Sequence, residues 1–260
     1  MENTGLREKI LRILVLCLFL SLTISMISFV IDRTPPRITK LPTDNFVSLN
    51  ISKSILYDDC ESDTGDCEDR VVVEGSSASG MIFSELESGE SLILTAGHFC
   101  ETAISDSPDA HYLSTLFQME TKVTVTDFYG TVWEAEIIDV DNDNDLCLVK
   151  SDMPAFRKIR LADSMPEVGD NVYTISAPLS IRSEGAVPHF EGNFSGCDIS
   201  GMCFFTIPAI FGSSGSLILN SRLEVVGMIQ LADPRFPVIG MGVGIKDIKR
   251  FLDRNEVDYN

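Results

Sequence analysis

Three short segments, each joining a reactive polar side chain to an apolar run, constrain the fold of this chain more than any other feature. In chain order they are His98 after residues 92–97, Asp145 before residues 146–149, and Ser214 within residues 212–216, just before the apolar residues 217–219. A serine hydroxyl is a weak nucleophile at neutral pH, so it needs a base to take its proton and a carboxylate to orient that base. The sequence therefore predicts that these three side chains meet as one proton-transfer unit.

The order of the three residues separates the folds that share this chemistry. An α/β-hydrolase runs serine, acid, histidine, but no histidine follows Ser214, and a subtilisin-type chain places its aspartate before its histidine. Only the order histidine, aspartate, serine remains. The chain has three histidines, and we expect His111 and His189 to be structural or surface groups, which leaves His98 as the base.

Four motifs in this order resemble those of trypsin-like (chymotrypsin-fold) serine proteases, near the bacterial high-temperature-requirement and glutamyl endopeptidase branches. Along the chain they are Thr95 to His98, Asp145 to Val149, residues 161–164 together with 168–173, and Gly212 to Ser216. The resemblance implies a serine endopeptidase that uses His98, Asp145 and Ser214 and forms an acyl-enzyme. It also implies an oxyanion hole made by the backbone N–H groups of Gly212 and Ser214.

The resemblance further implies a substrate-binding cleft for protein or peptide substrates. Pro208 is expected near the floor of the specificity pocket, and Gln230, Leu231 and Ala232 are expected to pair with the substrate backbone. Ser213 and Ser216 depart from the usual motif. They keep open an alternative function, a catalytically inactive domain that serves as a membrane-tethered interaction module.

No cofactor and no metal are expected. Four alternating aspartates, Asp139, Asp141, Asp143 and Asp145, are reminiscent of a calcium loop. However, Asn144 and Lys150 stand where such a loop requires glycine and glutamate, and a turn leading into a strand is the simpler interpretation. The formal net charge of −19 also argues against nucleic-acid binding, which needs a cationic surface.

Short runs of Val, Ile, Thr and Phe separated by turn residues from Arg70 onward predict an all-β fold. With the resemblance, we expect two six-stranded antiparallel β-barrels in a domain at residues 68–254. Four apolar residues at helical spacing predict a C-terminal helix on the second barrel, before a tail at residues 255–260. They are Ile245, Ile248, Phe251 and Leu252.

Residues 13–31 carry no charge, and this is about the length of a helix that crosses a bilayer. A cleaved signal peptide is the alternative, but its apolar region is usually shorter, and no Ala-x-Ala cleavage site is present. We therefore predict a transmembrane signal anchor after a short tail, residues 1–12, and a linker at residues 32–67. The catalytic domain would then lie outside the cytoplasm, on the periplasmic or extracellular side.

Seven cysteines agree with an extracytoplasmic location. Cys60 with Cys67 and Cys197 with Cys203 each flank a short polar loop that a disulfide could close. Cys147 lies inside an apolar run, where we interpret it as a small buried hydrophobic residue. Cys100 could either form a disulfide or pack in the core.

Overall fold

The computed structural model describes residues 40–57, 69–104, 108–114, 118–154 and 158–259, together with Phe19. The chain divides into two units, residues 1–38 and residues 39–260, and the fold described below is that of the second unit. The predicted membrane span at residues 13–31 lies outside the described residues apart from Phe19. Among the described residues, no helix combines the length and the apolar character needed to cross a membrane.

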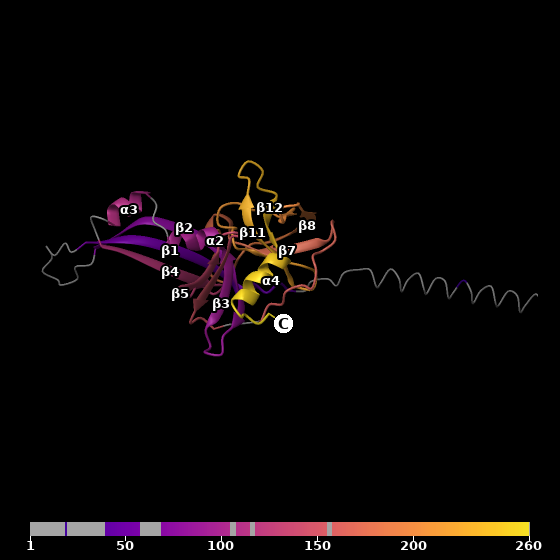
Figure 1. Ribbon diagram of the computed structural model, residues 1–260, viewed down its shortest axis with the longest axis horizontal. Helices are drawn as coiled ribbons and strands as arrows, with labels where there is room; N and C mark the ends of the chain where they lie inside the picture. Colours follow the sequence, from indigo (N-terminus) through magenta and orange to yellow (C-terminus); the bar gives the residue numbers. More distant parts are fainter. Residues whose placement is uncertain are drawn as a thin grey trace, which may run out of the picture. The chain divides into compact units, whose positions relative to one another are not determined.

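Twelve strands in the described residues form two closed barrels of antiparallel strands, which confirms the predicted architecture. The first barrel has the strand order β1-β2-β3-β6-β5-β4. Its strands are β1 (Phe46–Tyr57), β2 (Asp69–Glu85), β3 (Ser91–Ala96), β4 (Gln118–Asp127), β5 (Val132–Asp141) and β6 (Leu146–Ser151). In Figure 1, β1, β2 and β4 run side by side as one long ribbon, as their pairing requires.

The second barrel has the strand order β10-β11-β12-β9-β8-β7. Its strands are β7 (Asn171–Ile175), β8 (His189–Cys197), β9 (Met202–Phe205), β10 (Leu217–Leu219), β11 (Val225–Ala232) and β12 (Gly240–Gly244). The short strand β10 is fully buried, as its three consecutive apolar residues predict. It follows directly on the turn that carries Ser214, so the barrel core fixes the position of that turn.

The first barrel begins earlier in the chain than the sequence analysis predicted. Residues 46–57, which fall within the predicted linker at residues 32–67, form β1, paired with β2 on one side and β4 on the other. The Asn and Ser residues of this segment were misleading. Residues 47–52 alternate between apolar and polar, and the apolar ones, Val47, Leu49 and Ile51, are buried. A sequence period of two is typical of a strand.

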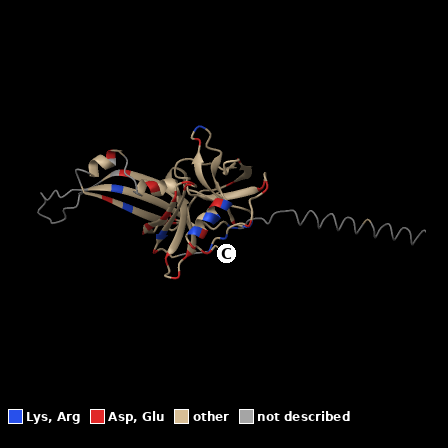
Figure 2. Ribbon diagram, in the orientation of Figure 1, with Lys and Arg blue, Asp and Glu red and all other residues tan. Residues whose placement is uncertain are grey.

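The described helices are short and sit at the edges of the barrels. They are α2 (Gly97–Ile104), α3 (Pro108–Ser114) and α4 (Ile245–Arg254), with single 3₁₀ turns η1 (Thr43–Asn45) and η2 (Pro178–Ser180). All four apolar residues that predicted the C-terminal helix are buried in α4. Arg254 at its end donates to the Asp139 carboxylate on β5 at 2.6 Å, so α4 also contacts the first barrel. In Figure 2, basic residues are coloured on α4, while acidic residues are spread over both barrels.

The hydrophobic core explains why the two barrels stay together. One cluster of buried residues lies within the first barrel and another within the second. The largest cluster joins both barrels, since it contains Leu94 and Leu148 from the first and Leu217 and Met228 from the second. Burying a side chain of this size contributes about 1.5–3 kcal/mol. The face between the barrels is therefore fixed by packing, and residues from both can form one site there.

Candidate active site

His98 is placed by the buried strand β3, which leads directly into helix α2. Gly97 is the joint between them. A Cβ at Gly97 would lie 2.9 Å from the backbone carbon of Asp145 and from the nitrogen of Leu146, closer than real contacts allow, so only glycine permits this approach. The close approach brings the residue after Gly97 next to Asp145.

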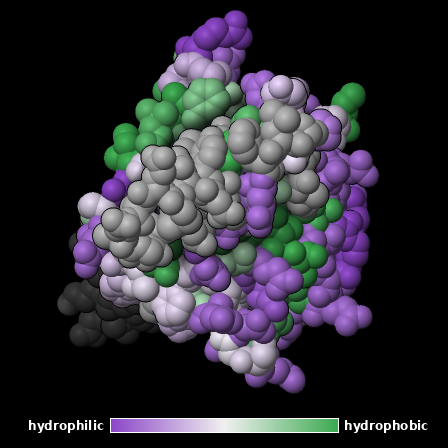
Figure 3. Space-filling model, turned by 90° about the vertical axis from the view of Figure 1, so that its left-hand side faces the viewer, coloured by the Kyte–Doolittle hydropathy of each residue, from purple (hydrophilic) through white to green (hydrophobic). Residues whose placement is uncertain are grey.

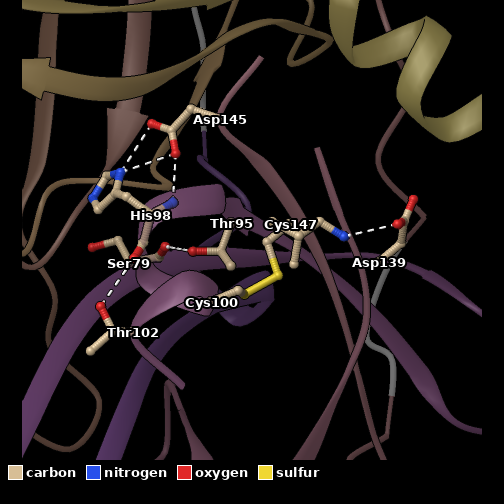
Figure 4. Close-up of a disulfide and its surroundings, with 9 residues drawn as sticks. Ser79, Thr95, His98, Cys100, Thr102, Asp139, Asp145 and Cys147 are labelled. Atoms are coloured by element: carbon tan, nitrogen blue, oxygen red, sulfur yellow. Dashed lines mark hydrogen bonds and ion pairs between the residues drawn. A yellow bond between two sulfur atoms is a disulfide. The ribbon is translucent and has the colours of Figure 1, made fainter. Parts of the chain in front are cut away.

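Asp145 faces the imidazole of His98 (Figure 4). Its carboxylate accepts from the backbone N–H of His98 at 2.6 Å and lies 2.9 and 3.1 Å from the ring atom Nδ1. A carboxylate can only accept, so Nδ1 carries the shared proton and Nε2 is left as an acceptor. This is the tautomer that a general base needs.

The pKa of the His98 imidazole is raised above its ordinary value. The hydrogen bond to Asp145 is the largest cause, and the negative charges of Asp145 and Glu101 add to it, while partial burial opposes them. The raised pKa favours the protonated ring. A base held in this way accepts a proton more readily than a free imidazole does.

The Asp145 backbone has a φ of +51°, a left-handed conformation that is uncommon for residues other than glycine. Two hydrogen bonds hold the backbone on either side of this strained point. The side-chain amide of Gln230 donates to the carbonyls of Asn144 at 2.6 Å and of Asp145 at 2.8 Å. Gln230 lies on β11 and is only 6% exposed, so the second barrel fixes the orientation of the first barrel's carboxylate.

Ser214 lies in a turn shaped by two glycines with positive φ, Gly212 at +87° and Gly215 at +85°. A Cβ at Gly215 would lie 2.1 Å from the carbonyl oxygen of Ser79, so the turn packs directly against the first barrel. The Ser214 hydroxyl donates to the carbonyl of Gln230 at 3.2 Å. In this structure the hydroxyl is directed toward β11.

His98, Asp145 and Ser214 all line one cavity of about 380 Å³. The structure thus brings together three side chains that the sequence places far apart. The remaining lining residues are Ile210, Phe211, Ile229, Gln230, Leu231, Ala232 and Pro234, which are apolar apart from Gln230. Among the described residues that line the cavity, His98 and Asp145 are the ionisable ones.

Two N–H groups of the serine turn have no acceptor within the described part of the chain. Among the described residues, the N–H groups of Ser213, Gly215 and Ser216 donate to backbone carbonyls, whereas no acceptor is found for those of Gly212 and Ser214. Unpaired backbone donors are uncommon in folded proteins unless water or a ligand satisfies them. The turn can therefore present two donors to an anionic oxygen.

The predicted substrate-binding residues fall into two groups. Gln230, Leu231 and Ala232 line the cavity, and Leu231 is half exposed. Pro208 is exposed and is not among the lining residues, so the structure does not bring it to this cavity. Phe211 also lines the cavity and is 71% exposed beside the serine turn, although it was not predicted as a substrate-binding residue. Its position directly before the Gly212 motif was the available signal. Figure 3 shows apolar areas between hydrophilic projections on one face of the molecule.

Two disulfides lie in the described part of the chain. Cys197 pairs with Cys203 across the β8–β9 turn, as predicted. Cys100 pairs with Cys147, so the interpretation of Cys147 as a simple core residue was wrong. The pair Cys60 and Cys67 lies outside the described residues. The Cys100–Cys147 bond joins α2, just after His98, to β6, just after Asp145 (Figure 4).

Two closed antiparallel barrels thus place a histidine, an aspartate and a serine at one shared cavity. A family model described as "Trypsin-like peptidase domain" matches residues 78–228. This is more than half of the chain, and the chain therefore belongs to the trypsin-like peptidase family.

Comparison with solved structures gives the same fold. The chain is similar to the serine endoprotease from Yersinia pestis, with a TM-score of 0.56 and 19% sequence identity over 82% of this chain and 62% of that one. At this identity the likeness shows the fold alone, and the chain spans less than two thirds of the length of that structure. A search of curated proteins found no match.

Proposed function

We propose that this protein is a serine endopeptidase anchored in a membrane by residues 13–31. The observation that carries the catalytic proposal is the grouping of Ser214 with a His98–Asp145 pair at one cavity, with Nδ1 of His98 bonded to the Asp145 carboxylate. The proposal extends the family's general chemistry to named residues of this chain.

The first half of the reaction forms an acyl-enzyme. The Ser214 hydroxyl turns from the Gln230 carbonyl toward Nε2 of His98, gives its proton to that nitrogen, and attacks the carbonyl carbon of the scissile peptide bond. The resulting oxyanion accepts from the N–H groups of Gly212 and Ser214. Asp145 stabilises the imidazolium. The proton then passes to the leaving amine, the C–N bond breaks, and the acyl group stays on Ser214.

The second half regenerates the enzyme. Water gives a proton to His98 and attacks the acyl carbon, and the imidazolium returns that proton to Ser214 as the carboxylic acid product leaves. The chain supplies every group that these steps need, so the proposal requires no cofactor.

A fluorophosphonate probe tests whether Ser214 is activated. We expect covalent labelling of the folded protein and none of Ser214→Ala, because the probe reacts only with a serine whose proton a base removes. The matched control is Ser216→Ala in the same turn. Its hydroxyl is buried without a hydrogen-bond partner among the described residues, so its removal should leave labelling intact. An unlabelled, folded wild-type protein would support the inactive interaction module instead.

Membrane fractionation tests the anchor. The uncharged run at residues 13–31 is the basis of this part of the proposal. We expect the full chain to stay in the membrane fraction after a high-salt or alkaline wash and to be released only by detergent. A matched variant with Leu16, Leu18 and Leu20 changed to Lys should appear in the soluble fraction. Release of the unchanged chain by the wash would contradict the anchor.

A further inference from the structure

Ser79 on β2 makes an unusual set of contacts with the serine turn. The residue is fully buried. Its N–H donates to the Ser214 carbonyl at 2.9 Å, and its hydroxyl donates to the Gly212 carbonyl at 2.7 Å. The hydroxyl also accepts from the N–H of Ala177 at 3.0 Å. Its own carbonyl accepts from the Thr95 hydroxyl at 2.8 Å (Figure 4). One residue of the first barrel thus holds two segments of the second.

The carbonyls that Ser79 holds alternate along the chain with the two unpaired donors. Each peptide unit is planar, so fixing the carbonyls of Gly212 and Ser214 fixes the peptide planes that follow those residues. The N–H groups of Gly212 and Ser214 lie on the peptide planes that precede these residues, next to the fixed ones. With the carbonyls tied to the first barrel, the turn has little freedom to rotate its N–H groups away from the cavity.

The contact of the Ser79 hydroxyl with the Ala177 N–H bears on the peptide unit between Phe211 and Gly212. Ala177, whose N–H bonds to the Ser79 hydroxyl, begins a segment in which the N–H of Leu179 donates to the Phe211 carbonyl at 2.7 Å. That carbonyl belongs to the same peptide unit as the N–H of Gly212. The Ser79 hydroxyl therefore restrains the Gly212 N–H in two ways. It bonds directly to the Gly212 carbonyl, and it holds the segment at residues 177–180, which bonds to the Phe211 carbonyl.

We propose that Ser79 is a positioning residue that holds the N–H groups of Gly212 and Ser214 in the orientation needed to bind an oxyanion. The inference rests on the proposed function, since it gives those N–H groups a catalytic role. Ser79 touches neither His98 nor Asp145 in the hydrogen bonds described, so its effect should be separable from the base.

The test compares Ser79→Ala with Ser91→Ala. Ser91 is a matched control because it is also fully buried in the first barrel, and its hydroxyl donates to a backbone carbonyl, that of Met153, at 2.7 Å. Both changes remove one buried hydroxyl and should weaken the fold in urea unfolding, Ser79→Ala somewhat more because its hydroxyl makes two hydrogen bonds. Only Ser79→Ala removes the bonds to the Gly212 carbonyl and the Ala177 N–H, while the Ser79 N–H still donates to the Ser214 carbonyl.

For Ser79→Ala we expect kcat to fall about ten- to a hundredfold, the loss typical of reacting groups displaced by about 1 Å. KM should change less than about threefold, since the cavity lining is intact. The pH at which activity falls on the acid side should not move, because the His98–Asp145 pair is unchanged. Ser91→Ala should match the wild type in all three quantities. Equal kcat values for the two variants, or a change confined to KM, would overturn the inference.

Failure of the inference can be told from failure of the proposed function. If the wild type is labelled by the fluorophosphonate and Ser79→Ala is labelled at the same rate, Ser79 has no positioning role although the enzyme is active. If the wild type is not labelled, amide NMR of Gly212 and Ser214 decides the structural part. We expect their resonances to shift in Ser79→Ala and not in Ser91→Ala, and unchanged resonances would overturn the inference. Should Ser79→Ala not fold, Ser79→Cys fills the site with a slightly larger side chain that has a weaker hydrogen-bonding group and is expected to change the same measurements in the same direction.

Discussion

Asp145→Asn is expected to lower kcat about 10⁴-fold without unfolding the protein. Asparagine tolerates the left-handed backbone found at this position, so the turn should persist. The amide oxygen would take the place of Oδ1, which accepts from the backbone N–H of His98. The amide NH₂ group then faces Nδ1 and forces that nitrogen to accept. The proton moves to Nε2, which can no longer act as a base.

The same variant should change the pH dependence. In the wild type, activity requires neutral His98 and should be lost as the pH falls through a pKa above the ordinary histidine value of about 6.5. Removing the carboxylate removes the largest cause of that raised pKa, so the residual activity of Asp145→Asn should persist to lower pH. Histidine NMR titration and the pH profile of kcat/KM measure both effects.

Asp143→Asn is the control for this experiment, because it removes one negative charge from an exposed position in the same turn. Its kcat should stay within about twofold of the wild type, as expected for an exposed charge screened by solvent. If Asp145→Asn retained activity within tenfold of the wild type, Asp145 would not be the residue that orients His98.

Replacing Cys100 and Cys147 together with alanine is expected to lower the free energy of unfolding by about 4 kcal/mol, the chain-entropy value for a loop of 47 residues. This is a large part of the stability of a typical domain. The corresponding change at Cys197 and Cys203 opens a loop of only 6 residues and should cost about 2 kcal/mol. Urea unfolding of both double variants under oxidising conditions measures the difference.

The Cys100–Cys147 bond should also affect activity. It joins the helix that carries His98 to the strand that follows Asp145, so its loss should loosen the contact between those side chains. We therefore expect kcat to fall in this double variant and to change little in the one at Cys197 and Cys203. The reverse order, in stability or in kcat, would contradict the assigned roles of the two disulfides.

Local sequence signals were sufficient for the segments that carry the site. His98, Asp145 and Ser214 each adjoin an apolar run, and each run became a buried strand. The helical spacing before the C-terminus likewise predicted α4. These predictions succeeded because strand and helix periodicity depend on residues that are neighbours in the chain.

In the first barrel, the alternation of apolar and polar residues in one segment indicated a strand, but the polar composition of that segment led to the wrong prediction. The composition of residues 46–57 indicated a linker, yet residues 47–52 alternate apolar and polar side chains, as a strand does. The predicted domain start at residue 68 was too late for this reason. Periodicity was the better guide, since burial on one face of a sheet depends on alternate positions and not on average composition.

Local patterns along the chain were enough to predict the fold class, the order of the reactive residues and the strands that carry them. Which groups meet depends on tertiary packing: Cys100 with Cys147, Gln230 with the Asp145 backbone, and Ser79 with the serine turn. These contacts join residues 47, 85 and 133 positions apart. Their partners are chosen by the packing of the two barrels against each other, a property of the whole folded chain that no local pattern records.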